Sequence, residues 1–202
     1  MDRDAVELLE KQDAFSGYFR IDRLRLKFPL YEGGMSREIV REVLERGRVA
    51  AVLLVDPDRD AVVLIEQFRP GPYAAGHHPW LIETVAGVIE GSESAEELAR
   101  RESMEEADCA ITDLFPIMHF FTSPGASTES VTMLCGRVDS TDAGGIHGLD
   151  EEGEDIRVMV LSVDDALALL HEGRIVNAKT IVALQWLAMN YDSVKERWPA
   201  EA

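Results

Sequence analysis

Apolar and polar positions divide the chain into a short leading segment and a longer main region. Between residues 15 and 30, apolar side chains alternate with arginine and lysine, which predicts β-structure with a turn near Asp22 and Arg23. The segment at residues 36–46 is ambiguous, because its apolar positions also have helical spacing. The first 14 residues are strongly charged, and we expect a loose helix or a tail there.

Apolar runs in the main region predict a series of strands. They lie at residues 49–55, 61–67, 81–86, 117–121, 131–138 and 156–161. Helices are predicted behind capping side chains at residues 95–107, from Ser162 to Gly173, and from Asn177 to about Tyr191. Strands and helices in this order are typical of an α/β fold, here a mixed sheet sandwiched between helices.

The helix predicted at residues 95–107 carries acidic residues on the side that should be buried. At 3.6 residues per turn, Glu102 and Glu106 lie on the same side as Leu98, and Glu105 flanks that side. Buried carboxylates are costly unless they are paired or bind a metal ion. Oxygen-only donors suit Mg²⁺, with Mn²⁺ also possible. A solvated acidic helix is the alternative.

The strongly negative net charge of the chain disfavours negatively charged partners. The formal net charge is −18, so the surface should repel nucleic acid and anionic membranes, and neither is an expected partner. The cysteines, Cys109 and Cys135, have no disulfide or zinc spacing. No signal peptide or membrane-spanning run is visible, and the expected location is the cytoplasm.

The acidic helix and the residues before it resemble the Nudix box of Nudix hydrolases. The matching positions are Gly87, Glu93, Arg101, Glu102, Glu105 and Glu106. Two positions depart from the motif, since Ser103 replaces the usual aliphatic or small residue and Asp108 replaces the usual glycine. We expect Asp108 to end the helix in a left-handed conformation.

The resemblance implies roles for this group of residues. Glu102 and Glu106 would bind the metal ion, with the carbonyl oxygen of Ala86 as a further ligand. Arg101 would pair with one of the carboxylates and orient it, and Glu105 would lie near the catalytic centre.

Segments outside the motif resemble one group of this family, the ADP-ribose pyrophosphatases. The similarity extends from about Gly17 to Trp186 and is carried by residues 63–69, 83–87, 123–125 and 181–187. It implies Mg²⁺-dependent hydrolysis of the ADP-ribose diphosphate to AMP and ribose 5-phosphate. Another nucleotide sugar, such as GDP-mannose or ADP-glucose, and a non-catalytic nucleotide-binding sensor are the alternatives.

The long acidic loop at residues 139–155 also matches this group. A loop of that length inside a compact domain is usually functional or disordered. The resemblance implies that Glu152 is the general base and that Glu154 is another metal ligand, although neighbouring acids are alternatives.

The resemblance further implies a homodimer in which the leading segment is exchanged between subunits. Residues 1–45 would form a small β-rich dimerisation unit, and residues 46–202 would form the hydrolase domain. The similarity implies strand for residues 36–46 as well. Matching substrate-binding residues are an aromatic side chain that stacks on adenine, two anion-contacting arginines and an acid, namely Tyr18, Arg41, Arg69 and Glu129.

Overall fold

The computed structural model describes residues 2–149, 151 and 153–199. The chain divides into two compact units. Unit 1 comprises Met1–Arg48 and Phe121–Ser130, and unit 2 comprises Val49–Phe120 and Val131–Ala202. Unit 1 therefore includes a loop from the middle of the chain as well as the leading segment.

Unit 1 is built on an antiparallel sheet in the order β1-β2-β3. After a short 3₁₀ turn, η1 (Arg3–Ala5), the strands are β1 (Glu7–Ser16), β2 (Arg20–Lys27) and β3 (Ile39–Glu45). The loop of unit 1 joins the sheet end, since Leu44 and Ala126 are linked by a 2.8 Å main-chain hydrogen bond.

Two predictions for the leading segment were wrong, and one was confirmed. Residues 7–14 form most of β1 and not a helix or tail. The turn lies at Gly17, whose N–H donates to the Phe19 carbonyl at 2.9 Å, so β2 continues through the predicted turn. Asp22 is buried there and pairs with Lys11 of β1 at 2.7 Å, a contact that sequence periodicity does not reveal. The strand expected within residues 36–46 is β3.

Unit 2 is centred on a large sheet. Among the described residues its path is β10-β11-β5-β4-β9-β8, with β6 paired to β5 and β7 paired to β4. The strands are β4 (Arg48–Asp56), β5 (Ala61–Phe68), β6 (Trp80–Glu83), β7 (Val85–Val88), β8 (Asp113–Phe121), β9 (Ser130–Arg137), β10 (Ile146–His147) and β11 (Ile156–Ser162). The predicted main-region strands are present, except that the one predicted at residues 81–86 is divided, since β6 pairs with β5 and β7 pairs with β4. Strand β10 lies within the long acidic loop.

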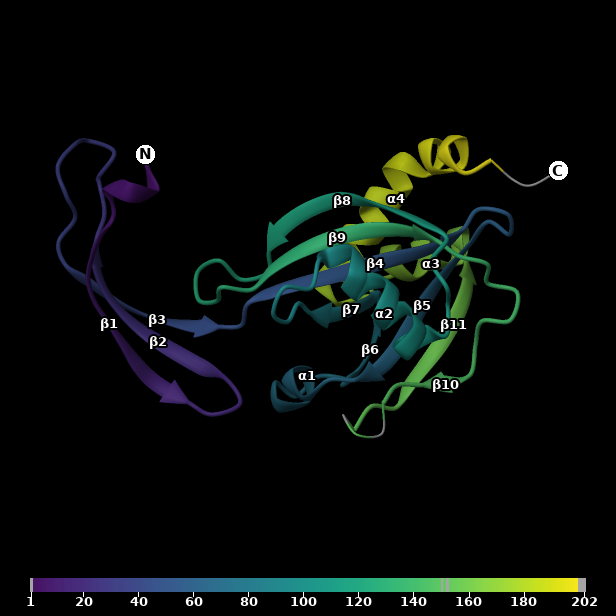
Figure 1. The fold of residues 1–202 in the computed structure, drawn as a ribbon, viewed down its shortest axis with the longest axis horizontal. Helices are drawn as coiled ribbons and strands as arrows, with labels where there is room; N and C mark the ends of the chain where they lie inside the picture. Colours follow the sequence, from purple (N-terminus) through teal and green to yellow (C-terminus); the bar gives the residue numbers. More distant parts are fainter. Residues whose placement is uncertain (1, 150, 152, 200–202) are drawn as a thin grey trace. The chain divides into compact units, whose positions relative to one another are not determined.

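Helices cover both faces of this sheet (Figure 1). They are α1 (Pro70–Ala74), α2 (Ala95–Ala107), α3 (Val163–His171) and α4 (Ala178–Arg197). Successive side chains of β4 point to opposite faces of the sheet. Ala51 and Leu53 therefore pack in the core beneath α3 and α4, while Val52 and Leu54 pack in the core beneath α2. Full burial of one such leucine contributes roughly 1.5–3 kcal/mol. The predicted α/β class, with a sheet between helices, is confirmed.

Helix α2 has the predicted bounds and ends. Ser94 and Glu97 form a complete capping box at its start. Asp108 ends it in the left-handed conformation, with φ of 50° and ψ of 38°. Helix α4 continues past the predicted end at Tyr191 to Arg197, where the next residue, Trp198, donates to Asp113 at 2.9 Å. No helix of the described residues is long and apolar enough to cross a membrane.

Candidate active site

Strand β7 and helix α2 bring two carboxylates together in unit 2. Glu106 is buried, at 2 % exposed, and its Oε2 accepts a 3.1 Å hydrogen bond from the backbone N–H of Ala86. Gly87 lies so close to Glu102 that a Cβ atom at this position would overlap the Glu102 carboxylate. The glycine of the motif is therefore required by the close approach of β7 to α2.

Burial and mutual repulsion disfavour the ionised forms of these acids. Burial, together with the charges of Glu102 and Glu154, raises the pKa of Glu106 to about 8. Burial also raises the pKa of Glu102, and the neighbouring charges of Glu105 and Glu154 add to the effect, while Arg101 opposes it. A pair of carboxylates held in this state is suited to a cation, which would stabilise both charges.

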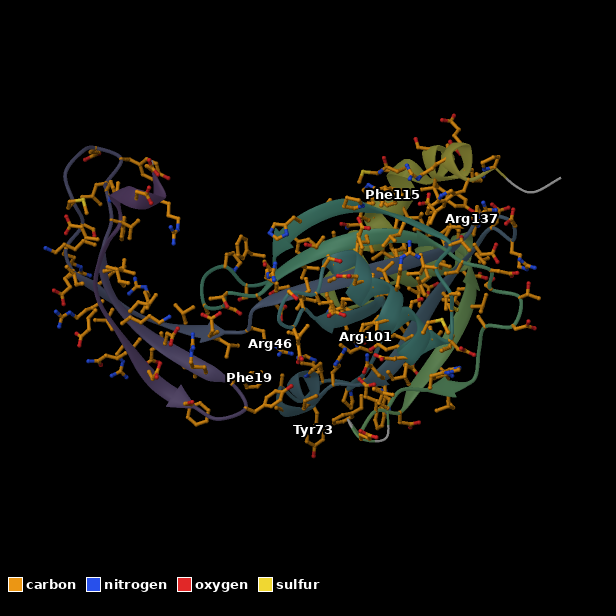
Figure 2. The ribbon with its side chains drawn as sticks, viewed as in Figure 1. Phe19, Arg46, Tyr73, Arg101, Phe115 and Arg137 are labelled. Carbon is orange, nitrogen blue, oxygen red and sulfur yellow. The ribbon has the colours of Figure 1, made fainter. Side chains whose placement is uncertain are left out.

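Arg101 lies on α2 (Figure 2) and hydrogen-bonds to several neighbouring carboxylates. Its guanidinium donates to Glu93 at 3.1 Å, to Glu102 at 3.0 Å and to Glu105 at 2.8 Å. The hydrogen bonds that Arg101 donates to Glu93 are the largest of the effects that raise its pKa. Arg101 thus pairs with carboxylates as the sequence predicted, and its guanidinium orients three acidic side chains of the motif.

The acidic loop approaches the same helix. The N–H of Gly148 donates to the carbonyl of Glu105 at 3.2 Å, which ties the loop to α2. Glu154 accepts a 3.2 Å hydrogen bond from the N–H of Leu149, and its charge helps to raise the pKa values of Glu102 and Glu106. The predicted general base, Glu152, lies outside the described residues.

Arg69 lies just after the end of β5 and pairs with Glu83 of β6. Its Nη2 lies 2.8 Å from Glu83 Oε2, and its Nε also donates to that carboxylate. Burial acts to lower the pKa of Arg69, but Glu83 outweighs it, with smaller contributions from Glu106 and Glu154, and the pKa lies above its usual value. Sequence reasoning missed Glu83, although a charged residue inside the apolar run at residues 81–86 was a usable signal.

The other predicted substrate-binding residues belong to unit 1. Tyr18 is 88 % exposed and packs edge-on against Phe19, with ring centroids 4.9 Å apart. Arg41 is exposed and donates to the carbonyl of Val40 at 2.8 Å. Glu129 pairs with Arg46, at 3.7 Å, and the Arg46 guanidinium also lies over the Phe19 ring (Figure 2). Because Tyr18 is exposed and contacts Phe19 edge-on, a face of its ring is available to a ligand.

The donor set of unit 2 fits a divalent cation that prefers oxygen. Among the residues described, no group of three or more His, Cys, Asp or Glu is arranged to hold a metal ion. The candidate site instead combines Glu102 and Glu106 with the main chain of β7. Both carboxylates lie beside Ala86 and Gly87, and their raised pKa values are those expected of acids placed together for a cation.

A separate cavity of about 690 Å³ lies on the opposite face of the sheet. It is bordered by Glu66, Trp80 and Ile82 and by the loop between α3 and α4. Ile82 packs in the core beneath α3 and α4, whereas the carboxylates described above project from α2. This cavity therefore does not belong to the candidate active site.

The fold and the acidic site together are those of a Nudix protein. The model of the NUDIX domain matches residues 45–184, and the chain belongs to this family. The match includes β7, α2 and the acidic loop.

Several relatives resemble the chain along nearly its whole length. It is 44% identical to the ADP-ribose pyrophosphatase of Escherichia coli (strain K12) over 196 residues, covering 97% of this chain and 94% of that protein. The ADP-ribose pyrophosphatase of Haemophilus influenzae is 39% identical, with 96% and 90% covered. The GDP-mannose pyrophosphatase of Pectobacterium atrosepticum is 31% identical, with 89% and 92% covered.

A solved structure shares the fold. The crystal structure of an ADP compounds hydrolase aligns with a TM-score of 0.69 at 18% identity, and 96% of each chain is covered. At this identity, the likeness concerns the fold alone.

Proposed function

We propose that the protein hydrolyses the diphosphate of ADP-ribose to AMP and ribose 5-phosphate, with Mg²⁺ as cofactor and Mn²⁺ as a possible substitute. The observation that carries the proposal is the buried pair Glu102 and Glu106 beside β7, in a chain 44% identical to a protein named ADP-ribose pyrophosphatase. Identity over 97% of this chain favours the same reaction class and substrate.

Residues of unit 2 would bind the metal ion and orient the acids around it. Glu102, Glu106, Glu154 and the carbonyl oxygen of Ala86 would hold the metal ion. When bound, the ion supplies charge neutralisation at the diphosphate and lowers the pKa of water. Arg101 holds Glu102 and Glu105 in place through its hydrogen bonds.

Other residues would accept the proton of water, bind the diphosphate and contact the nucleotide. Glu152, in the acidic loop, accepts the proton of the attacking water. Arg69 binds a diphosphate oxygen, since the charges of Glu106 and Glu154 act on it and it therefore lies near the acids. Tyr18, Arg41 and Glu129 contact the nucleotide, with the Tyr18 ring stacked on adenine.

The active form is proposed to be a homodimer that exchanges residues 1–45, while residues 46–202 form the hydrolase domain. The sheet of unit 1 exposes large apolar side chains, including Leu8, Phe15 and Val40, which a partner surface would cover. The net charge of −18 argues against nucleic acid or anionic membrane as a partner. The proposed location is the cytoplasm, where the free cysteines stay reduced.

A second candidate substrate is GDP-mannose, because a protein named GDP-mannose pyrophosphatase is 31% identical to this chain. Turnover of ADP-ribose, GDP-mannose and ADP-glucose should be compared at equal concentration with Mg²⁺ and with EDTA, and Glu102→Gln serves as the matched control. We expect ADP-ribose to give the highest kcat/KM and EDTA to abolish it. Highest turnover of GDP-mannose would reassign the substrate, and binding without any turnover would indicate a sensor.

A further inference from the structure

Asn177 is the N-cap residue of α4, and its side chain makes contacts in two directions. Its Oδ1 accepts from the backbone N–H of Thr180 at 3.1 Å, which is the capping interaction. Its Nδ2 donates to Oε1 of Glu83 at 2.9 Å, across 94 residues of sequence. Because the capping bond requires the oxygen to face the helix, the amide nitrogen must face Glu83.

Glu83 is the link between this cap and Arg69. Its carboxylate is 1 % exposed and accepts from Arg69 at 2.8 Å. Burial of a carboxylate is costly unless its oxygens accept hydrogen bonds, and Asn177 supplies one of these donors. Arg69 pairs with Glu83 through Nε and Nη2. Its Nη1 donors have no partner among the described residues and could receive another anion.

A second contact makes this arrangement rigid. The hydroxyl of Thr180 donates to Asn177 Oδ1 at 3.2 Å and accepts from the backbone N–H of Thr84 at 2.9 Å. Thr84 immediately follows Glu83, so the start of α4 is connected to both the side chain of Glu83 and the main chain after it. Thr84 and Thr180 are buried, at 1 % and 0 % exposed.

We propose that Asn177 is a positioning residue for substrate binding: through Glu83 it holds the guanidinium of Arg69 in the orientation that receives a diphosphate oxygen. This inference rests on the proposed function, because it assigns Arg69 to the diphosphate of the substrate. Under this proposal, a residue at the start of α4 influences the affinity for substrate through Glu83 and Arg69.

The two roles of Asn177 can be separated by substitution. Serine is as good an N-cap as asparagine but is too short to reach Glu83, so Asn177→Ser should keep the helix start and lose the bond to Glu83. Ser162→Ala is the matched control, since Ser162 caps α3 by accepting from the N–H of Asp165 at 3.0 Å and is outside this network. It should lower thermal stability without changing KM.

Steady-state kinetics with ADP-ribose give the first test. Asn177→Ser should raise KM by about three- to tenfold with kcat within about twofold, as expected when an orienting bond to a charged group is lost. The same substitution in an Arg69→Ala background should have no further effect on KM. An unchanged KM, a KM rise equal to that in Ser162→Ala, or an undiminished effect in the Arg69→Ala background would each overturn the proposal.

A second readout does not need turnover. The side-chain Nε–H of Arg69, assigned in an NMR spectrum by its absence in Arg69→Lys, should exchange slowly with solvent in the parent protein. Asn177→Ser should speed this exchange several-fold, and Ser162→Ala should not. Failure of ADP-ribose turnover would reject the proposed function alone, whereas unchanged exchange in Asn177→Ser would reject the positioning role.

Discussion

The backbone N–H of Ala86 donates to Oε2 of Glu106 at 3.1 Å, so β7 and α2 are joined at the point where the acids of the motif meet. This one bond cannot compensate for burial, and the pKa of Glu106 rises to about 8. Burial therefore disfavours the ionised form of this carboxylate, which a bound cation would favour.

The first prediction concerns the loss of either acid. Glu102→Gln and Glu106→Gln should each lower turnover at least about a hundredfold, the scale of losing a catalytic electrostatic group. The fold should persist, because replacing one acid relieves their repulsion. Activity assays at saturating Mg²⁺, with thermal melts, test this. Near-parental rates in both variants would refute the metal site.

The second prediction is a dependence of stability on pH in the metal-free protein. The folded protein binds the Glu106 proton more tightly than the unfolded chain does, since the pKa rises from 4.5 to about 8. Its favourable contribution is complete below about pH 4.5 and is lost as the pH rises to about 8, at about 1.4 kcal/mol per pKa unit.

Urea unfolding in EDTA between pH 5 and pH 8 measures this effect. The free energy of unfolding should fall with pH more steeply in the parent protein than in Glu106→Gln, and Mg²⁺ should restore it at high pH. Equal slopes for the two proteins would contradict the titration assigned to Glu106.

The third prediction follows from the approach of Gly87 to Glu102. Gly87→Ala places a methyl group where the carboxylate lies, so the Glu102 side chain or β7 must shift. A displacement of about 1 Å can cost up to about a hundredfold in rate, and we expect at least a tenfold loss of kcat. Gly71→Ala is the control, since nothing lies within 4 Å of its added Cβ. Equal rates for the two variants would show that the close approach is unimportant.

The fourth prediction tests the choice of base. Glu152→Gln should lower kcat with little change in KM, because the proton transfer matters only in the transition state. Glu151→Gln and Glu154→Gln provide the comparison. A larger kcat defect in Glu151→Gln would move the role to Glu151, and a larger defect in Glu154→Gln that persists at saturating Mg²⁺ would contradict the choice of Glu152.

The fifth prediction concerns the exchanged dimer. Tyr18→Ala should raise KM for ADP-ribose by about ten- to a hundredfold, the equivalent of roughly 1–3 kcal/mol of stacking, and Tyr18→Phe should be nearly silent. Mixed dimers of Tyr18→Ala and Glu102→Gln subunits should regain about half of full activity at low substrate, since one site then carries neither substitution. No gain beyond the average of the two mutant homodimers would place each site within one chain.

Helix α2 and the placement of its acids could be predicted from the sequence, because the signals are local. The capping box at Ser94, the left-handed end at Asp108 and the acids on the buried side all depend on residues within a few turns of one another. The spacing of the motif then identified the family. Most predicted strands of the main region were equally local, since each was an apolar run, but the break at Thr84 that divides residues 81–86 into β6 and β7 was not predicted.

Contacts between distant segments were decided by the tertiary structure alone. Strand β1 forms because β2 pairs with it and Lys11 reaches the buried Asp22, so its charged sequence resembled a tail. The pairing of Arg69 with Glu83 and the bond from Asn177 span 14 and 94 residues, and local propensity contains no information about either. The physical reason is that a buried charge selects its partners from whatever the packing of the sheet and helices brings within hydrogen-bonding distance.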